Sequence, residues 1–356
     1  MRAALGLNYI QVSFLFTVLE GSDIISDAIF GISGDIWSRR LLISVGTITA
    51  GIGLIVMGLA PGYLLLLTGV AIQGFAGGPF VGLSQASLMD AHPGQHDHMM
   101  AWWSIIGNIG FLATLLTVAV AYALGVDWRT LFILGGVLFI IYALFLARLR
   151  FPRAEKAIEE GEAEGEEVKS ISSWAALKAA ALDMKLLRWA LILPLLEIPL
   201  NSFAVLYFHD SVGLSNVAAS SALLIIIVCS LVGKALLPWL LRYMAGMSLL
   251  KFSIWMGIAS YGIFLLVPGV LPKFIALAVF SLVESSWHTL AQAQAYATQP
   301  GKSGVVLSVT SLISPITSLL PLLVGVIATW VGLGWGLAVL LVGPVTAGIL
   351  LVFRPA

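Results

Sequence analysis

Charged side chains are scarce in this sequence: aspartate, glutamate, lysine and arginine make up only 10% of its 356 residues. A soluble domain carries about 25% of such residues. With so few charges the chain cannot cover a surface that faces water, so we expect lipid to be its main solvent. The 18 basic and 18 acidic residues cancel, which argues against nucleic-acid binding through net charge.

Cysteine is almost absent as well. The one cysteine, Cys229, lies in an apolar run, which excludes a disulfide framework and a thiolate metal site. One cluster, formed by His92, His96, Asp97 and His98, could bind a metal, but a solvated loop is the simpler interpretation because no regular element fixes their geometry. The sequence contains no phosphate-binding loop and no nucleophilic triad. It therefore predicts neither an enzyme nor a cofactor or metal site.

Long apolar runs dominate the chain instead. Hydrophobic residues make up 60% of it, and eleven stretches are long enough to cross a bilayer, which takes roughly 20 apolar residues. Each must be helical, because lipid offers no hydrogen-bonding partner to backbone N–H and C=O groups. The predicted spans are 8–31, 42–60, 63–89, 99–124, 128–149, 186–208, 217–240, 247–267, 272–297, 303–329 and 332–353.

The basic residues are distributed unevenly between the two sides of these spans. With the loop that contains Arg39 and Arg40 placed in the cytoplasm, fourteen basic residues fall inside and three, among them Lys273, fall outside. The remaining one, Lys234, lies within a predicted span. Cytoplasmic loops are enriched in lysine and arginine. The sequence therefore predicts a multi-pass protein of the cell (inner) membrane with a cytoplasmic C-terminus.

One long polar stretch divides the spans into five and six. Residues 155–167 contain seven glutamates, which is typical of a solvated linker. Residues 173–182 look like a short interfacial helix with Ser173 as its N-cap. We predict three parts: an N-terminal helical bundle over 1–149, a cytoplasmic linker over 150–185 and a C-terminal helical bundle over 186–356.

Short sequence matches suggest that the two bundles arose from one duplicated unit. Gly6-Leu7-Asn8 precedes the first predicted span, and Gly213-Leu214-Ser215 precedes the seventh. In the second bundle a complete span, 186–208, comes before this match, whereas only five residues come before it in the first. The simplest interpretation is a plan of six plus six spans from which this chain lacks the first helix.

The loop after the first span resembles the signature of the major facilitator superfamily, G-x-L-A-D-R-x-G-R-K/R. Four residues match that signature: Gly31, Asp35, Arg39 and Arg40. A carboxylate and arginines at a helix end can clip neighbouring helices together in one conformer, so we predict a conformational-switch loop here.

Other elements resemble the same superfamily less fully. Gln73-Gly74 is similar to part of R-x-x-Q-G, with Val70 at the arginine position, and 128–132 is similar to W-R-x-x-F. The second-half copy of the loop motif keeps Gly233 and Arg242. It has Leu237 where the acid belongs. The resemblance implies an all-α, two-bundle membrane fold with 11 transmembrane helices and the activity of a secondary transporter.

Acidic residues inside the predicted spans are candidates for function, because a charge there costs about 2.5–3.5 kcal/mol on insertion scales. Glu20, Glu197 and Glu284 lie near the midpoints of three spans. Transporters with internal repeats place their substrate and ion sites at this depth. We predict that these glutamates line the substrate and proton path, with His288 as a relay. Gln292 continues the i+4 stripe that Glu284 and His288 begin.

Two further acids share a helix face with Glu20. Asp23 and Asp27 follow it at i+3 and i+7, and structural pairing with a neighbouring helix is the favoured interpretation for both, although Asp23 is kept in the predicted path. Pro194 and Pro199 bracket Glu197 and should interrupt its helix.

Glycines repeat every four residues in the third span, at Gly74, Gly78 and Gly82. Small residues at this spacing predict close helix packing rather than contact with a ligand.

The sequence as a whole predicts a secondary transporter that moves a small solute by alternating access. The excess of acids at mid-depth favours proton coupling, a cationic or polar solute, or both. A membrane scaffold or assembly factor that reuses the fold without transporting is the alternative, because a fold alone does not define a function.

Overall fold

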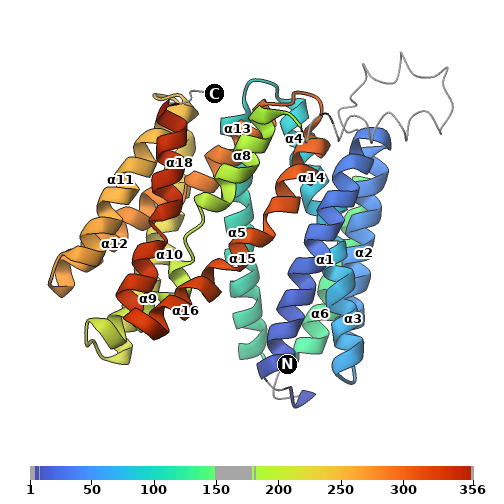
Figure 1. The fold of residues 1–356 in the computed structure, drawn as a ribbon. Helices are drawn as coiled ribbons and strands as arrows, with labels where there is room; N and C mark the ends of the chain where they lie inside the picture. Colours follow the sequence, from blue (N-terminus) through green and yellow to red (C-terminus); the bar gives the residue numbers. More distant parts are fainter. Residues whose placement is uncertain (1–4, 8, 149–178, 180–181, 354–356) are drawn as a thin grey trace. The chain divides into compact units, whose positions relative to one another are not determined.

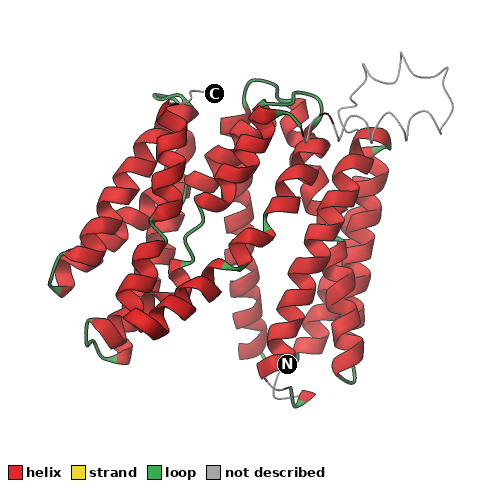
Figure 2. Cartoon of the chain, in the orientation of Figure 1, coloured by secondary structure: helices red, strands yellow, loops and turns green. Residues whose placement is uncertain are grey.

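The structure is a computed structural model that describes residues 5–7, 9–148, 179 and 182–353 (Figure 1). In these residues every regular element is a helix (Figure 2). This confirms the predicted all-α fold. The glutamate-rich part of the predicted linker and nearly all of its expected interfacial helix lie outside the described residues.

Nine helical stretches of the described chain are long and apolar enough to cross a membrane. Each agrees with a predicted span to within three residues at either end. The stretch at Tyr9–Ile36 is also long enough but carries four acidic residues, and the span predicted at 303–329 is divided into shorter helices. The total of eleven spans and the missing first helix therefore stay predictions.

The chain packs into two units, which we describe separately. Unit 1 consists of Met1–Pro93, Ile109–Leu186 and Gln299–Leu312, and unit 2 of Gly94–Asn108, Leu187–Thr298 and Ile313–Ala356. Each unit thus includes one short segment from the other side of the predicted linker. The predicted bundle boundaries, which follow the linker, stay a prediction.

Unit 1 is held together by helices that approach closely at glycines. On α2, a Cβ added to Gly51 would lie 2.7 Å from the carbonyl oxygen of Gly136 on α6. Backbones can come this close only where side chains are absent. The unit contains α1 (Tyr9–Ile36), α2 (Arg39–Leu59), α3 (Tyr63–Phe75), the π-helix η2 (Gly78–Gly82), α4 (Leu83–Ala91), the later part of α5 (His96–Ala123), α6 (Trp128–Leu146) and nearly all of α14 (Ser303–Ile313).

The glycine stripe of the third predicted span packs against α1. A Cβ on Gly74 would lie 2.4 Å from the carbonyl oxygen of Leu19, and one on Gly82 would lie 2.6 Å from Oδ1 of Asp27. A Cβ on Gly78 would lie 2.6 Å from both the carbonyl carbon and the hydroxyl oxygen of Ser26 on α1. The prediction of close helix packing is confirmed for all three glycines.

Unit 2 contains most of the remaining helices. Gly332 separates two of them with φ = +94°, a conformation that glycine adopts without steric cost. The helices of unit 2 are α8 (Met184–Leu195), α9 (Leu200–Leu206), the π-helix η3 (Tyr207–Ser211), α10 (Asn216–Leu240), α11 (Gly246–Leu266), α12 (Val270–Glu284), α13 (Trp287–Ala297), α15 (Pro315–Ser318), α16 (Leu320–Val331), α17 (Leu333–Val339) and α18 (Val342–Phe353).

Five predicted spans are divided between successive elements: 63–89, 186–208, 272–297, 303–329 and 332–353. In the first of them, α3 gives way to the π-helix η2 and then to α4. The break between Leu195 and Leu200 was expected from the two prolines, and the structure confirms it. The continuous helices predicted over 272–297, 303–329 and 332–353 are wrong, because each stops and restarts. At the first of these, the hydroxyls of Ser285 and Ser286 donate to carbonyls three residues back, at 2.8 Å each, in competition with the backbone ladder. The second interruption coincides with prolines, which lack an N–H group.

A buried lysine fixes one end of α11 in unit 2. The ammonium of Lys273 on α12 donates to the carbonyls of Phe264 (2.6 Å) and Leu265 (3.2 Å) and to the hydroxyl of Tyr207 (2.9 Å). Only 8% of the lysine is exposed. A cation is favourable at a helix C-terminus, where the last carbonyls lack intrahelical partners. From the sequence, Lys273 was counted only as a basic residue on the outer side.

Replacing Lys273 by methionine is expected to destabilise unit 2. The substitution keeps a long apolar stem but leaves two backbone carbonyls and the Tyr207 hydroxyl without their donor, at a cost of about 2–4 kcal/mol in the free energy of unfolding. Thermal unfolding in detergent would show a lower Tm for this variant. The same substitution at the exposed Lys302 is the control, and equal Tm values for the two variants would contradict the assignment.

Candidate functional site

The predicted switch loop, residues 31–40, forms a charged network with α4. Arg39 pairs with Asp35 at 2.6 Å and with Asp90 at 2.7 Å. The side chains are 11%, 17% and 13% exposed, respectively, so water screens these charges less than at an open surface. Arg40, by contrast, is exposed. Asp90 was not predicted, because it lies 51 residues after Arg39 in the chain.

The same network holds the N-terminal end of α14. Oδ2 of Asp35 accepts a hydrogen bond from the backbone N–H of Val305 at 3.0 Å, and Ser303 donates to Asp90. A Cβ on Gly31 would lie 2.4 Å from the carbonyl oxygen of Gly304, so the matching glycine lets α1 meet α14. The loop therefore joins α1, α2 and α4 to a helix from the other side of the linker. Its role as a switch stays a prediction.

The three acids of α1 lie in different surroundings within unit 1. Glu20 is exposed. A Cβ on Gly77 would lie 1.7 Å from Oδ1 of Asp23, so Asp23 points at the glycine-lined packing surface. Asp27 accepts a hydrogen bond from the hydroxyl of Ser311 on α14 at 2.9 Å. These contacts support the structural interpretation of Asp23 and Asp27.

Two of the predicted glutamates lie at helix interruptions in unit 2. Glu197 falls in the non-helical stretch between α8 and α9, and Glu284 is the last residue of α12. Each lies at the middle of a 28-residue span, Met184–Ser211 or Val270–Ala297. Glu284 is close enough to Glu197 to be repelled by its charge and close enough to Lys234 to be attracted. The two glutamates thus lie within electrostatic range of each other.

A close crossing of α10 and α12 places Lys234 in this group. A Cβ on the preceding Gly233 would lie 2.1 Å from the carbonyl oxygen of Leu282, so the two helices touch at this point. The Lys234 ammonium is 3.5 Å from the amide oxygen of Asn108 on α5. None of the ion pairs within 4.0 Å in the described residues includes Lys234, so its charge is left available inside the site.

The expected polar stripe after Glu284 is not regular. His288 is exposed, whereas Gln292 is buried at 6% exposed. The i+4 argument assumed an unbroken helix, but the chain leaves the helix at Ser285 and Ser286 before α13 begins. Glu20 belongs to unit 1, so its grouping with Glu197 and Glu284 stays a prediction.

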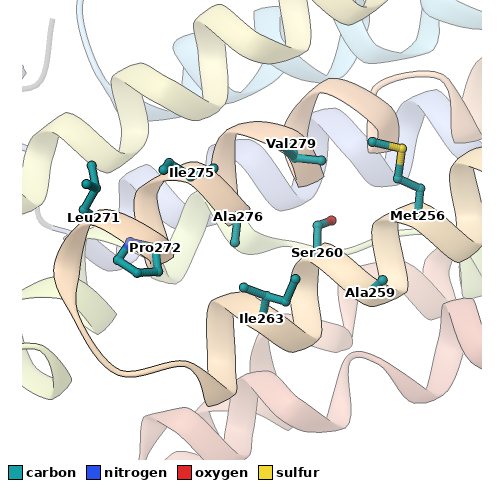
Figure 3. A pocket seen from close by; sticks show the side chains of 9 residues that line it. All are labelled: Met256, Ala259, Ser260, Ile263, Leu271, Pro272, Ile275, Ala276 and Val279. Atoms are coloured by element: carbon teal, nitrogen blue, oxygen red, sulfur yellow. The ribbon is translucent and has the colours of Figure 1, made fainter.

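A groove between α11 and α12 is lined almost entirely by apolar side chains (Figure 3). Its volume is about 470 Å³, and Met256, Ile263 and Ile275 are among its lining residues. The hydroxyl of Ser260, its one polar side chain, donates to the carbonyl of Gly257 at 3.0 Å. The groove offers no free polar side chain to a polar solute, so we do not assign it to the solute path.

Comparison with known protein families agrees with this architecture. The family model described as "Major Facilitator Superfamily" matches residues 1–320 of the chain. The chain belongs to the Major Facilitator Superfamily. It is therefore a multi-pass integral membrane protein of a transporter family and not an enzyme.

Solved structures of superfamily members share the fold. The E. coli fucose:proton symporter FucP is 14% identical, with a TM-score of 0.76 over 98% of this chain and 92% of that one. The human organic anion transporter MFSD10 is 15% identical, with a TM-score of 0.72 over 98% and 87%. The proton:xylose symporter XylE is 13% identical, with a TM-score of 0.68 over 99% and 90%. At such identities the likeness extends to the fold only.

Sequence reasoning missed two members of the unit 2 group in this superfamily protein. Lys234 was recognised as a charge within a span but was not assigned to the site, and Asn108 was not considered. A charge within a span was a usable signal for Lys234. No sequence signal identified Asn108, because its contact with Lys234 joins residues 126 positions apart.

Proposed function

We propose that this protein is a proton-coupled secondary transporter that moves a small cationic or polar solute by alternating access. Glu197, Glu284 and Lys234 would form the core of its solute and proton site. The observation that supports the proposal is that Glu284 lies within electrostatic range of both Glu197 and Lys234 in unit 2, with both glutamates at helix interruptions at mid-span.

Interrupted helices support a binding role for this region. Non-helical backbone is tolerated at membrane depth where it is buried in protein or lines a water-filled cavity, and transporters use such breaks to bind substrates and ions. Glu197 lies within one break and Glu284 borders another. A purely structural pair of acids would not require both breaks to coincide with the glutamates.

The charges of the group favour a proton or one positive charge on the solute. With both glutamates ionised, two negative charges face the single positive charge of Lys234, which leaves a net charge of −1. An unbalanced charge inside a membrane is unfavourable. A proton on one glutamate or a monovalent cationic solute removes it, and exchange between these two ligands would couple solute movement to the proton gradient.

The other predicted path residues take lesser roles in this proposal. Gln292 is buried in α13 and can orient a polar solute, while the exposed His288 could exchange protons with water. Glu20 would line the path in unit 1, whereas Asp23 faces the helix-packing surface at Gly77. The cell membrane as location and a cytoplasmic C-terminus remain part of the proposal, supported by the distribution of basic residues.

Transport by the purified protein in proteoliposomes tests the proposal against the scaffold alternative. Vesicles with an acidic lumen that contain a pH-sensitive dye would be exposed to panels of monovalent amines, amino acids and sugars, so that the proton gradient points outward. We expect at least one solute class to accelerate proton exit, because each entering solute exchanges for a proton. Vesicles with the double variant Glu197→Gln/Glu284→Gln are the control, and solute-dependent proton exit that survives both substitutions would contradict the proposed site.

A further inference from the structure

A second carboxylate binds a helix N-terminus in unit 2. Asp97 lies in the first turn of α5, and its Oδ1 accepts a hydrogen bond from Nε2 of Gln294 on α13 at 2.8 Å. The same carboxylate accepts a hydrogen bond from the backbone N–H of Gly246, the first residue of α11. A negative charge is favourable at this end of a helix. Asp97 thereby joins the start of α5 to two helices from the other side of the linker.

This contact has the same design as the one that Asp35 makes in unit 1. A Cβ on Gly304 would lie 2.7 Å from Oδ1 of Asp35, and a Cβ on Gly246 would lie 2.0 Å from Oδ2 of Asp97. In both places a carboxylate from the first part of the chain reaches a helix end in the second part only because a glycine leaves room. One partner of each contact lies in an exchanged segment, Gly94–Asn108 or Gln299–Leu312.

The second-half copy of the loop motif lacks the acid of the first. It keeps Gly233 and Arg242 but has Leu237 at the position that Asp35 occupies in the first copy. Asp97 brings a carboxylate from the first part of the chain to the start of α11, the helix that follows this second copy.

We infer that Asp97 is a second conformational latch, which holds the start of α5 on α11 and α13 and must release before the predicted cytoplasmic side can open. The inference rests on the proposed alternating access. Its test therefore measures the conformation of the protein directly and requires no solute.

A buried reporter next to the latch makes its opening measurable. The single cysteine, Cys229, would be replaced by serine, and Ala101→Cys would be introduced. Ala101 lies one helical turn after Asp97 and is 0% exposed, so it shares the helix face of the latch. The measurement is the rate at which a membrane-impermeant maleimide labels this cysteine in inside-out vesicles.

Two substitutions should open the latch by different physical means. Gln294→Glu places a second negative charge against Asp97, and Gly246→Ala pushes the carboxylate away from the helix end without changing any charge. We expect each to raise the labelling rate about tenfold, within the usual range of conformational coupling. The double variant Asp97→Asn/Gln294→Glu exchanges donor and acceptor, restores a hydrogen bond, and should return labelling toward the parent rate.

Gln95→Glu is the matched control, because it adds the same charge two residues from Asp97 at an exposed position. It should label at the parent rate. Parent-like labelling of both Gln294→Glu and Gly246→Ala would overturn the latch, as would a double variant that labels as fast as Gln294→Glu. If the two variants label faster but the protein transports no solute, the result supports the latch and contradicts the proposed transport function.

Discussion

Replacing Glu284 by glutamine is expected to abolish proton-driven accumulation of the solute while leaving solute exchange in place. Glutamine keeps the size and hydrogen-bonding capacity of the side chain but cannot release a proton. With one proton moved per solute, a gradient of one pH unit supports about tenfold accumulation. Without a titrating group at this position, the solute should only equilibrate across the membrane.

The comparison needs two assays on the same proteoliposomes: net uptake under a proton gradient, and counterflow of labelled solute without one. Glu284→Gln should fail in the first and succeed in the second. Asp210→Asn removes an exposed acid from the same unit and should behave as the parent in both assays. Tenfold accumulation by Glu284→Gln would contradict the assignment of Glu284 as a proton-binding residue.

Glu197→Gln and Lys234→Gln distinguish the effect of the negative charge beside Glu284 from the effect of the positive charge beside it. Lys234 attracts Glu284, whereas Glu197 repels it, so the two substitutions change the charge around Glu284 in opposite directions. If the solute is cationic, Lys234→Gln should strengthen its binding, because a competing positive charge is removed. Glu197→Gln should weaken it for the converse reason.

Replacing Gly31 by alanine is expected to separate α1 from α14 and to favour the state in which the cytoplasmic side is open. The added Cβ would lie 2.2 Å from the hydroxyl of Ser308 and 2.4 Å from the carbonyl oxygen of Gly304. The second of these atoms belongs to the backbone and cannot rotate away. Such overpacking costs about 1–3 kcal/mol, which corresponds to roughly a 5- to 150-fold shift between two conformers.

A cysteine at the fully buried position Val306 of α14, in a protein without Cys229, would report this separation through maleimide labelling from the cytoplasmic side. Gly21→Ala is the matched control, since a Cβ at Gly21 of the same helix meets no atom within 4 Å. Asp35→Asn should act in the same direction as Gly31→Ala and slow turnover. Equal labelling of the two alanine variants would contradict a switch at this contact.

Much of the fold could be predicted because lipid imposes a local rule. A segment that crosses the bilayer must be apolar and must satisfy its backbone hydrogen bonds internally, so nine spans could be placed to within three residues from composition alone. The interruption at Pro194 and Pro199 followed from equally local chemistry. The break at Ser285 and Ser286 did not, because serine hydroxyls compete with the helix ladder only in some settings.

The site could be predicted only in part. Glu197 and Glu284 were found because charges within spans are costly and therefore conspicuous. The periodicity argument then placed His288 beside Glu284 on an assumption of unbroken helix, and the structure leaves that histidine exposed. Asn108 could not be predicted, because an uncharged amide within a span does not indicate a site unless the residues around it are known.

The sequence by itself determined that this chain is a helical membrane protein with acids at mid-span and a charged loop of recognisable pattern. Those properties depend on residues that lie within one or two helical turns of each other. Only the tertiary structure decided which groups come near one another: Lys234 comes within electrostatic range of Glu284 near the crossing at Gly233, Asp35 contacts α14, and Asp97 contacts α11. These contacts join positions from 50 to 270 residues apart, and they arise where glycines let helices approach, which hydropathy and spacing along one helix do not specify.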